Sequence, residues 1–168
     1  MNLANQITLI RIAMIPLFMV VYHFGYTYAA LLIFLVAALT DFLDGYIART
    51  RNQVTDLGKF LDPLADKMLI SAAFVYLTYS NLLPPWVTIL VLFREFAVSG
   101  LRMVLAGDVV IAASIFGKVK TTLQIISVAW LMLEFPGGEI VYWTMLIITL
   151  ASGFDYFYKA WPDLQKEG

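Results

Sequence analysis

The hydrophobic residues of this chain lie in long runs that short polar or turn-forming segments interrupt. The stretch 12–40 contains no Asp, Glu, Lys or Arg, and at about 20 residues per membrane-spanning helix it is long enough for two spans. The stretch 68–93 is also free of charge, and turn residues within 80–85 divide it. A Pro-Gly-Gly sequence at 136–138 marks another break. The pattern predicts six helices, at residues 5–23, 28–49, 59–79, 84–106, 114–134 and 139–159.

Composition places these helices in a membrane. Of the 168 residues, 61% are hydrophobic and only 14% are charged, against roughly 25% charged residues in a soluble domain. The sequence therefore predicts an all-α, polytopic membrane protein with six transmembrane helices, forming a single membrane domain over 1–168. The absence of cysteine and the single histidine leave little room for a zinc site or for thiol chemistry. A net charge of −1 gives no indication of nucleic-acid binding.

The basic residues favour one orientation of the six helices. If the N-terminus is cytosolic, the three turns on the far side of the membrane contain no Lys or Arg. Basic residues concentrate on the cytosolic side of membrane proteins. We therefore expect an integral cell-membrane protein with both termini, and its polar site, facing the cytosol. Ten of the 11 basic residues then lie toward that side: Arg11, Arg49, Arg51, Lys59, Lys67, Arg102, Lys118, Lys120, Lys159 and Lys166.

Four aspartates stand out in this apolar setting. Asp41 and Asp44 are three residues apart at the end of the second predicted helix, and Asp62 and Asp66 are four apart at the start of the third. Each pair shares a helix face, and the short connection makes the two helices antiparallel neighbours. Converging carboxylates repel unless they bind cations, and oxygen ligands suit hard divalent ions. The spacing predicts a metal site for two divalent cations, although it loosens if Asp62 caps the third helix.

Small and basic residues accompany the aspartates. Gly45 and Ala48 lie on the same helix face as the first acidic pair, and Gly58 precedes Asp62 by one turn. The small side chains leave room for a ligand close to the backbone, and Arg49 can donate charge-assisted hydrogen bonds to a phosphate oxygen. These residues indicate a pocket for a metal-bound pyrophosphate.

The complete pattern resembles a family signature. The spacing is Asp41-x2-Asp44-Gly45-x2-Ala48-Arg49-x8-Gly58-x3-Asp62-x3-Asp66. It is similar to the signature of the CDP-alcohol phosphotransferases at every position. The resemblance implies a membrane enzyme, usually a homodimer, that transfers a phosphatidyl group from a CDP-linked lipid to an alcohol and releases CMP.

The same resemblance assigns roles to the residues of the signature. Asp41, Asp44 and Asp62 would bind the metal ions, Mg²⁺ or Mn²⁺, and Asp66 would be the general base as well as a possible metal ligand. The CDP-lipid site would comprise Gly45, Ala48, Arg49 and Gly58, with Asn5, Thr8 and Thr55 as further contacts. Alternatively, Asn5 and Thr8 cap the first helix and Thr55 shapes a loop.

The acceptor alcohol depends on residues outside the signature. The segments NQITLIR, FREFAVSGLR and GKVKTT resemble the phosphatidylglycerophosphate synthases, a branch of this family, which implies CDP-diacylglycerol as donor and glycerol 3-phosphate as acceptor. Arg94 lies deep within the fourth predicted helix, where a charge needs a polar cavity or an anionic partner. Glu95 is the expected ion-pair partner. The predicted acceptor-phosphate residues are Arg11, Arg94, Arg102, Lys118 and Lys120.

Two kinds of alternative function fit the same sequence features. The same chemistry would operate with inositol phosphate, serine or phosphatidylglycerol as acceptor. Outside the enzyme class, a cation carrier also uses acids within a membrane, although it would place them near the bilayer midplane.

Overall fold

The computed structural model describes the backbone of residues 3–51, 56–105 and 115–167, and side chains for 6–40, 64–103, 105, 117–162 and 164–165. The described backbone is helical apart from turns, which confirms the all-α prediction for these residues. The helices are α1 (Leu3–His23), α2 (Thr27–Arg51), α3 (Asp56–Tyr79), α4 (Pro85–Val104), α5 (Ile115–Met132) and α6 (Gly138–Glu167). Most ends fall within three residues of the predicted ones.

The end of α6 differs most from the prediction. The sequence predicts an end near residue 159, where the apolar run stops, but the helix continues to Glu167. An ion pair between Lys159 and Asp155, 2.7 Å apart and one turn away from each other, stabilises this part of the helix. The helix also tolerates Pro162. The hydrophobic pattern therefore shows where the apolar segment of α6 ends, but it does not show where the helix ends.

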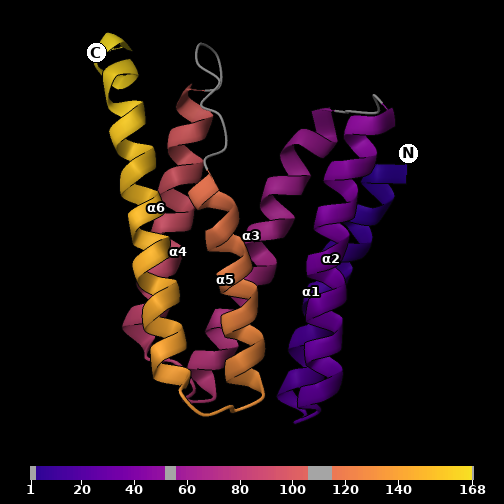
Figure 1. Ribbon diagram of the computed structural model, residues 1–168. Helices are drawn as coiled ribbons and strands as arrows, with labels where there is room; N and C mark the ends of the chain where they lie inside the picture. Colours follow the sequence, from indigo (N-terminus) through magenta and orange to yellow (C-terminus); the bar gives the residue numbers. More distant parts are fainter. Residues whose placement is uncertain (1–2, 52–55, 106–114, 168) are drawn as a thin grey trace.

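The helices alternate in direction along the bundle. The turns that join α1 to α2, α3 to α4 and α5 to α6 lie together at one end (Figure 1). The start of α1, the end of α2, the start of α3 and the end of α6 lie at the other end, close to both termini (Figure 1). We call this second end the signature end, because α2 finishes and α3 begins there.

Two groups of helices meet at α3. Helix α1 packs on α2 and α3, α6 packs on α4 and α5, and α3 also contacts both α4 and α5. A continuous apolar core runs through both groups and includes Phe18, Phe34 and Phe74, all fully buried. Tyr22 stacks on Phe18 with ring centroids 6.0 Å apart. Helix α3 thus connects the two halves of the bundle.

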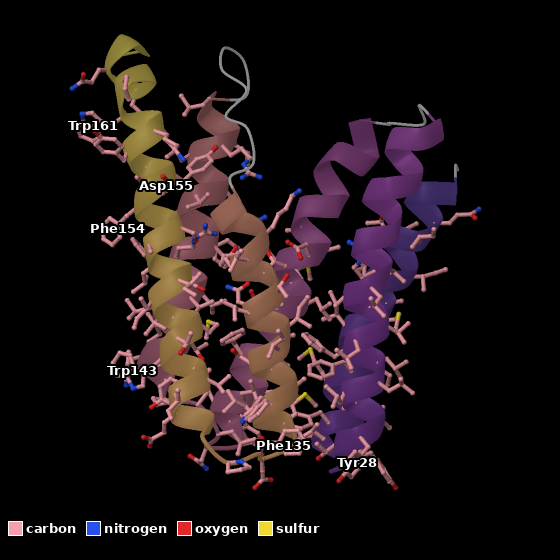
Figure 2. All side chains as sticks on the ribbon, in the orientation of Figure 1. Tyr28, Phe135, Trp143, Phe154, Asp155 and Trp161 are labelled. Atoms are coloured by element: carbon pink, nitrogen blue, oxygen red, sulfur yellow. The ribbon has the colours of Figure 1, made fainter. Side chains whose placement is uncertain are left out.

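The outer surface is apolar as well as the core. Tyr28, Phe93 and Phe154 are 81%, 71% and 76% exposed, and Figure 2 shows Trp143, Phe154 and Trp161 pointing away from the bundle along α6. Large contiguous apolar surfaces of this kind suit a lipid environment. Within the described residues, 6–23 and 138–162 are long and apolar enough to cross a membrane. Helix α4 contains three charged residues, Arg94, Glu95 and Arg102. Its composition alone therefore does not show whether it crosses the membrane.

Candidate functional site

The predicted metal-binding aspartates lie on two neighbouring helices at the signature end. Asp41 and Asp44 belong to the last part of α2, and Asp62 and Asp66 belong to α3. These two helices contact each other. Because α3 begins at Asp56, Asp62 lies inside the helix and does not cap it, so the interpretation of Asp62 as an N-cap is wrong. Asp66 is half-buried.

Several predicted residues lie outside the described side chains. The helical backbone is described at these positions, but the side chains are not, for Asn5, Asp41, Asp44, Gly45, Ala48, Arg49, Gly58 and Asp62. Thr55 lies outside the described residues altogether. Thr8, in contrast, is fully buried on α1, one turn before Arg11. The roles predicted for all the residues of this paragraph stay predictions.

A buried polar cluster joins α4, α5 and α6. Oε1 of Glu95 accepts hydrogen bonds from Nζ of Lys120 at 2.6 Å and from Nε2 of Gln124 at 3.1 Å. Nη1 of Arg94 donates to the same oxygen at 3.3 Å, and Nη2 donates to Oγ of Ser152 at 2.8 Å. We call Arg94, Glu95, Lys120, Gln124 and Ser152 the Glu95 cluster. The expected Arg94–Glu95 ion pair is confirmed.

Apolar packing encloses the Glu95 cluster along the helix axes. On α4, Val91 belongs to the main core and Val98 to a second apolar cluster, with Arg94 and Glu95 between them. On α6, Ser152 likewise lies between Leu146 of the main core and Tyr156 of the second cluster. Buried charges need partners in such surroundings, and the cluster supplies them.

The cluster is electrostatically linked to the candidate catalytic carboxylate. Lys120 is close enough to Asp66 of α3 for their charges to interact. Arg94 is within the same range of Lys120 and of Arg102. Three of the five predicted phosphate-binding cations therefore share one electrostatic neighbourhood, and Asp66 borders it.

Arg11 and Lys118 have different surroundings, and Arg102 has an aromatic neighbour as well. Arg11 is fully buried on α1, and its Nε donates to Oγ1 of Thr40 on α2 at 3.4 Å. Thr40 directly precedes Asp41, so this contact joins Arg11 to the start of the acidic segment. The guanidinium of Arg102 lies 5.4 Å from the ring centre of Tyr156, within the usual range of a cation–π interaction. Lys118 is exposed on α5.

Two members of the cluster were not predicted from the sequence. Gln124 follows Lys120 by one helical turn, so both side chains lie on one face of α5. Ser152 is reached from α4 across 58 residues of sequence. The spacing of Lys120 and Gln124 could have indicated a polar face on α5, whereas the sequence contains no signal that pairs Ser152 with Arg94.

Among the described residues, a cleft of about 470 Å³ lies at the other end of the molecule. Its lining includes Asn81 and Glu134 from the turns between α3 and α4 and between α5 and α6, and Glu139 and Tyr142 from the start of α6. These turns are opposite the signature end (Figure 1). The cleft and the candidate site residues therefore lie at different places. We assign the candidate site to the signature end, because the acidic and basic residues that can bind a phosphate compound lie toward it.

A known family of proteins matches most of this chain. Residues 1–154 match the model of the CDP-alcohol phosphatidyltransferases. The chain belongs to this family. The resemblance inferred from the aspartate signature is thereby confirmed, and a CDP-alcohol phosphatidyltransferase is a transferase enzyme, which removes the support for a cation carrier.

Individual relatives match this CDP-alcohol phosphatidyltransferase over nearly its whole length. The CDP-diacylglycerol--glycerol-3-phosphate 3-phosphatidyltransferase of Bacillus subtilis is 43% identical, over 98% of this chain and 97% of its own length. The protein of the same name from Escherichia coli is 38% identical, over 97% of both chains. That from Rickettsia bellii is 38% identical, over 93% of both chains.

Proposed function

We propose that the protein transfers the phosphatidyl group of CDP-diacylglycerol to sn-glycerol 3-phosphate, giving phosphatidylglycerophosphate and CMP in phospholipid synthesis. The observation that carries this proposal is the similarity to relatives that are named for this reaction. Two of them match 98% and 97% of the chain at 43% and 38% identity. The Glu95 cluster adds physical support, because it gathers two buried cations, one of which interacts electrostatically with Asp66. An acceptor that itself bears a phosphate needs such cations, whereas serine does not.

The aspartates are suited to divalent cations. In our proposal Asp41, Asp44, Asp62 and Asp66 hold two ions, Mg²⁺ or Mn²⁺. The contact between α2 and α3, which carry all four positions at one end of the bundle, is consistent with this, and so are the hard oxygen donors. When bound, the ions supply stabilisation of the negative charge on the pyrophosphate and on departing CMP. Gly45, Ala48, Arg49 and Gly58, with Asn5, Thr8 and Thr55, would bind the CDP-lipid.

Asp66 would act as the general base. A carboxylate within hydrogen-bond reach of the glycerol 3-phosphate hydroxyl takes its proton while the hydroxyl oxygen attacks the phosphatidyl phosphorus. The new P–O bond forms as the bond from that phosphorus to the CMP oxygen breaks. Arg94, Arg102 and Lys120 would hold the acceptor phosphate, with Lys118 and Arg11 as the remaining predicted contacts.

One assay tests the reaction and its acceptor. The purified protein in lipid–detergent micelles receives CDP-diacylglycerol, Mg²⁺ or Mn²⁺, and one acceptor at a time: glycerol 3-phosphate, inositol phosphate, serine or phosphatidylglycerol. We expect CMP release with glycerol 3-phosphate, loss of release with a chelator, and recovery when the metal is restored. Release with another acceptor alone would change the substrate, and no release with any acceptor would overturn the proposal.

We further propose a single membrane domain over 1–168 with six spans and the signature end in the cytosol. The positions of the basic residues support this orientation. Because the chain has no cysteine, a single introduced cysteine reports its side of the membrane. An impermeant maleimide should label Y28C in intact cells, and Q165C only after permeabilisation. Both wild-type residues are exposed, at opposite ends. The reverse pattern would overturn the orientation.

The family resemblance also leads us to propose a homodimer. Mass measurement of the purified protein in detergent, with the bound detergent subtracted, would distinguish a dimer from a chain of 18.9 kDa. A mass of one chain at the concentrations used for activity would contradict it.

A further inference from the structure

A single carboxylate oxygen organises the buried cations of the Glu95 cluster. Oε1 of Glu95 accepts from Lys120 at 2.6 Å, from Gln124 at 3.1 Å and from Arg94 at 3.3 Å. Arg94, Glu95 and Lys120 are only 9%, 6% and 7% exposed. Helices α4 and α5 each pack against α3 and α6. The hydrogen bond between Glu95 and Lys120 joins α4 directly to α5.

The charges of the cluster do not cancel. Among the five residues of the cluster, two cations, Arg94 and Lys120, share one carboxylate, and the charge of Asp66 on α3 acts on Lys120 in addition. Within the described residues, Nε of Arg94 is also buried without a hydrogen-bond partner. An ion pair whose purpose is only to join helices is most favourable when its charges and hydrogen bonds are balanced. A bound anion would satisfy the buried Nε of Arg94 and complement the excess of cations within the cluster.

The position of the cluster indicates which anion. Lys120 interacts electrostatically with Asp66, and Arg94 with Arg102. Lys120 therefore lies within electrostatic range of the candidate general base, across the contact between α3 and α5. A phosphate monoester bound to these cations would have its hydroxyl end free to approach the carboxylate of Asp66.

We propose that Glu95 is a positioning residue for the acceptor phosphate, holding the ends of Arg94 and Lys120 beside Asp66 while leaving their combined charge positive. This inference rests on the proposed function, since it concerns the same acceptor. Glu95 contacts both cations, and in this proposal it acts through them. Loss of Glu95 would free the side chains of Arg94 and Lys120 and leave Lys120 without its closest partner.

Steady-state kinetics with Glu95→Gln test this role. The variant keeps the size of the side chain and removes its charge. We expect kcat/KM for glycerol 3-phosphate to fall by roughly tenfold or more, because small displacements of positioning groups have effects of this size, with KM for CDP-diacylglycerol changed less than twofold. Glu95→Asp, which keeps the charge, should recover part of the loss. The matched control is Asp155→Asn, which removes a carboxylate from the more exposed pair with Lys159 and should behave like wild type.

A double-variant comparison separates positioning through Lys120 from a general loss of structure. In a Lys120→Met background, Glu95→Gln should lower kcat/KM for glycerol 3-phosphate by much less than in wild type, because the cation that it positions is gone. Equal effects in both backgrounds would overturn the proposal. If Glu95→Gln does not fold, Gln124→Leu provides the test, because it removes one hydrogen bond and no charge; it should raise KM for glycerol 3-phosphate alone.

The two proposals fail in different ways. If wild type releases no CMP with glycerol 3-phosphate, the proposed function is wrong. If wild type is active but Glu95→Gln has unchanged kinetics, or a lower KM for glycerol 3-phosphate, only the role of Glu95 is wrong. A lower KM would mean that Glu95 competes with the acceptor phosphate for the cations.

Discussion

Nζ of Lys120 lies 2.6 Å from Oε1 of Glu95, and the two residues come from different helices, 25 positions apart in the sequence. Both side chains are buried, yet their charges are not isolated from the rest of the site, because Lys120 also interacts with Asp66. This relationship joins α4 and α5 to the acidic end of α3.

Gly153→Ala should disturb Arg94 from the side of α6. A methyl group at this position would lie 2.9 Å from Cγ of Arg94, closer than carbon atoms pack, so the arginine side chain must move. We expect kcat/KM for glycerol 3-phosphate to fall by roughly tenfold. The measurement is CMP release at varied acceptor concentration.

Gly100→Ala is the matched control for that substitution. Apart from its chain neighbours and the nearby backbone of its own helix, no described atom lies within 4 Å of the added methyl group, and alanine favours a helix by about 0.5–1 kcal/mol over glycine. This variant should keep wild-type kinetics and unfold at a slightly higher temperature. Equal loss of activity in both variants would contradict a specific effect on Arg94.

Asp66→Asn should separate turnover from substrate binding. An amide cannot take the proton of the acceptor hydroxyl, and the loss of a general base lowers rates by about a hundredfold or more. We expect kcat to fall accordingly while CDP binding, measured by calorimetry with the metal present, persists. Loss of CDP binding as well would identify Asp66 chiefly as a metal ligand.

Tyr156→Leu should weaken the placement of Arg102. The ring supports the guanidinium at 5.4 Å from its centre, and cation–π interactions contribute about 0.5–1 kcal/mol when partly exposed. KM for glycerol 3-phosphate should rise by a factor of about 2–5. Tyr156→Phe keeps the ring and should leave KM unchanged; a rise in both variants would assign the effect to the hydroxyl group.

Thr88→Val should affect stability without affecting catalysis. The hydroxyl groups of Thr78 and Thr88 lie 2.6 Å apart and join α3 to α4 near the end of the bundle opposite the signature end. The Thr88 hydroxyl also lies 3.3 Å from the carbonyl oxygen of Phe74, and removing this buried hydroxyl should lower the free energy of unfolding by about 1 kcal/mol or more, as measured by thermal unfolding in detergent. Thr144→Val, at an exposed position that bonds only within its own helix, should have a smaller effect. Changed kinetics in Thr88→Val would contradict this separation.

The helices were predictable from the sequence because apolar runs and turn residues alternate along the chain. Most helix ends fall close to the prediction, whereas α6 extends past the apolar segment to Glu167. The family signature was equally predictable, since Asp62 and Asp66 belong to a fixed local spacing.

The Glu95 cluster was predictable only in part. The sequence predicts the ion pair between Arg94 and Glu95, because charged side chains in an apolar helix are costly to bury without a partner of opposite charge. It does not fix how α5 and α6 are rotated against α4. Lys120 and Ser152 therefore reach the cluster through tertiary packing, which local patterns do not determine.

The order in which the helices leave the ribosome gives the Glu95 cluster a consequence for biogenesis. When α4 is synthesised, Arg94 and Glu95 have only each other, since the partners on α5 and α6 come as many as 58 residues later. We expect α4 to remain poorly accommodated in lipid until α6 arrives. A chain that stops after Met132 should consequently be degraded faster than the full chain in a pulse-chase experiment, so the same charges that serve the acceptor would also report complete assembly to the cell.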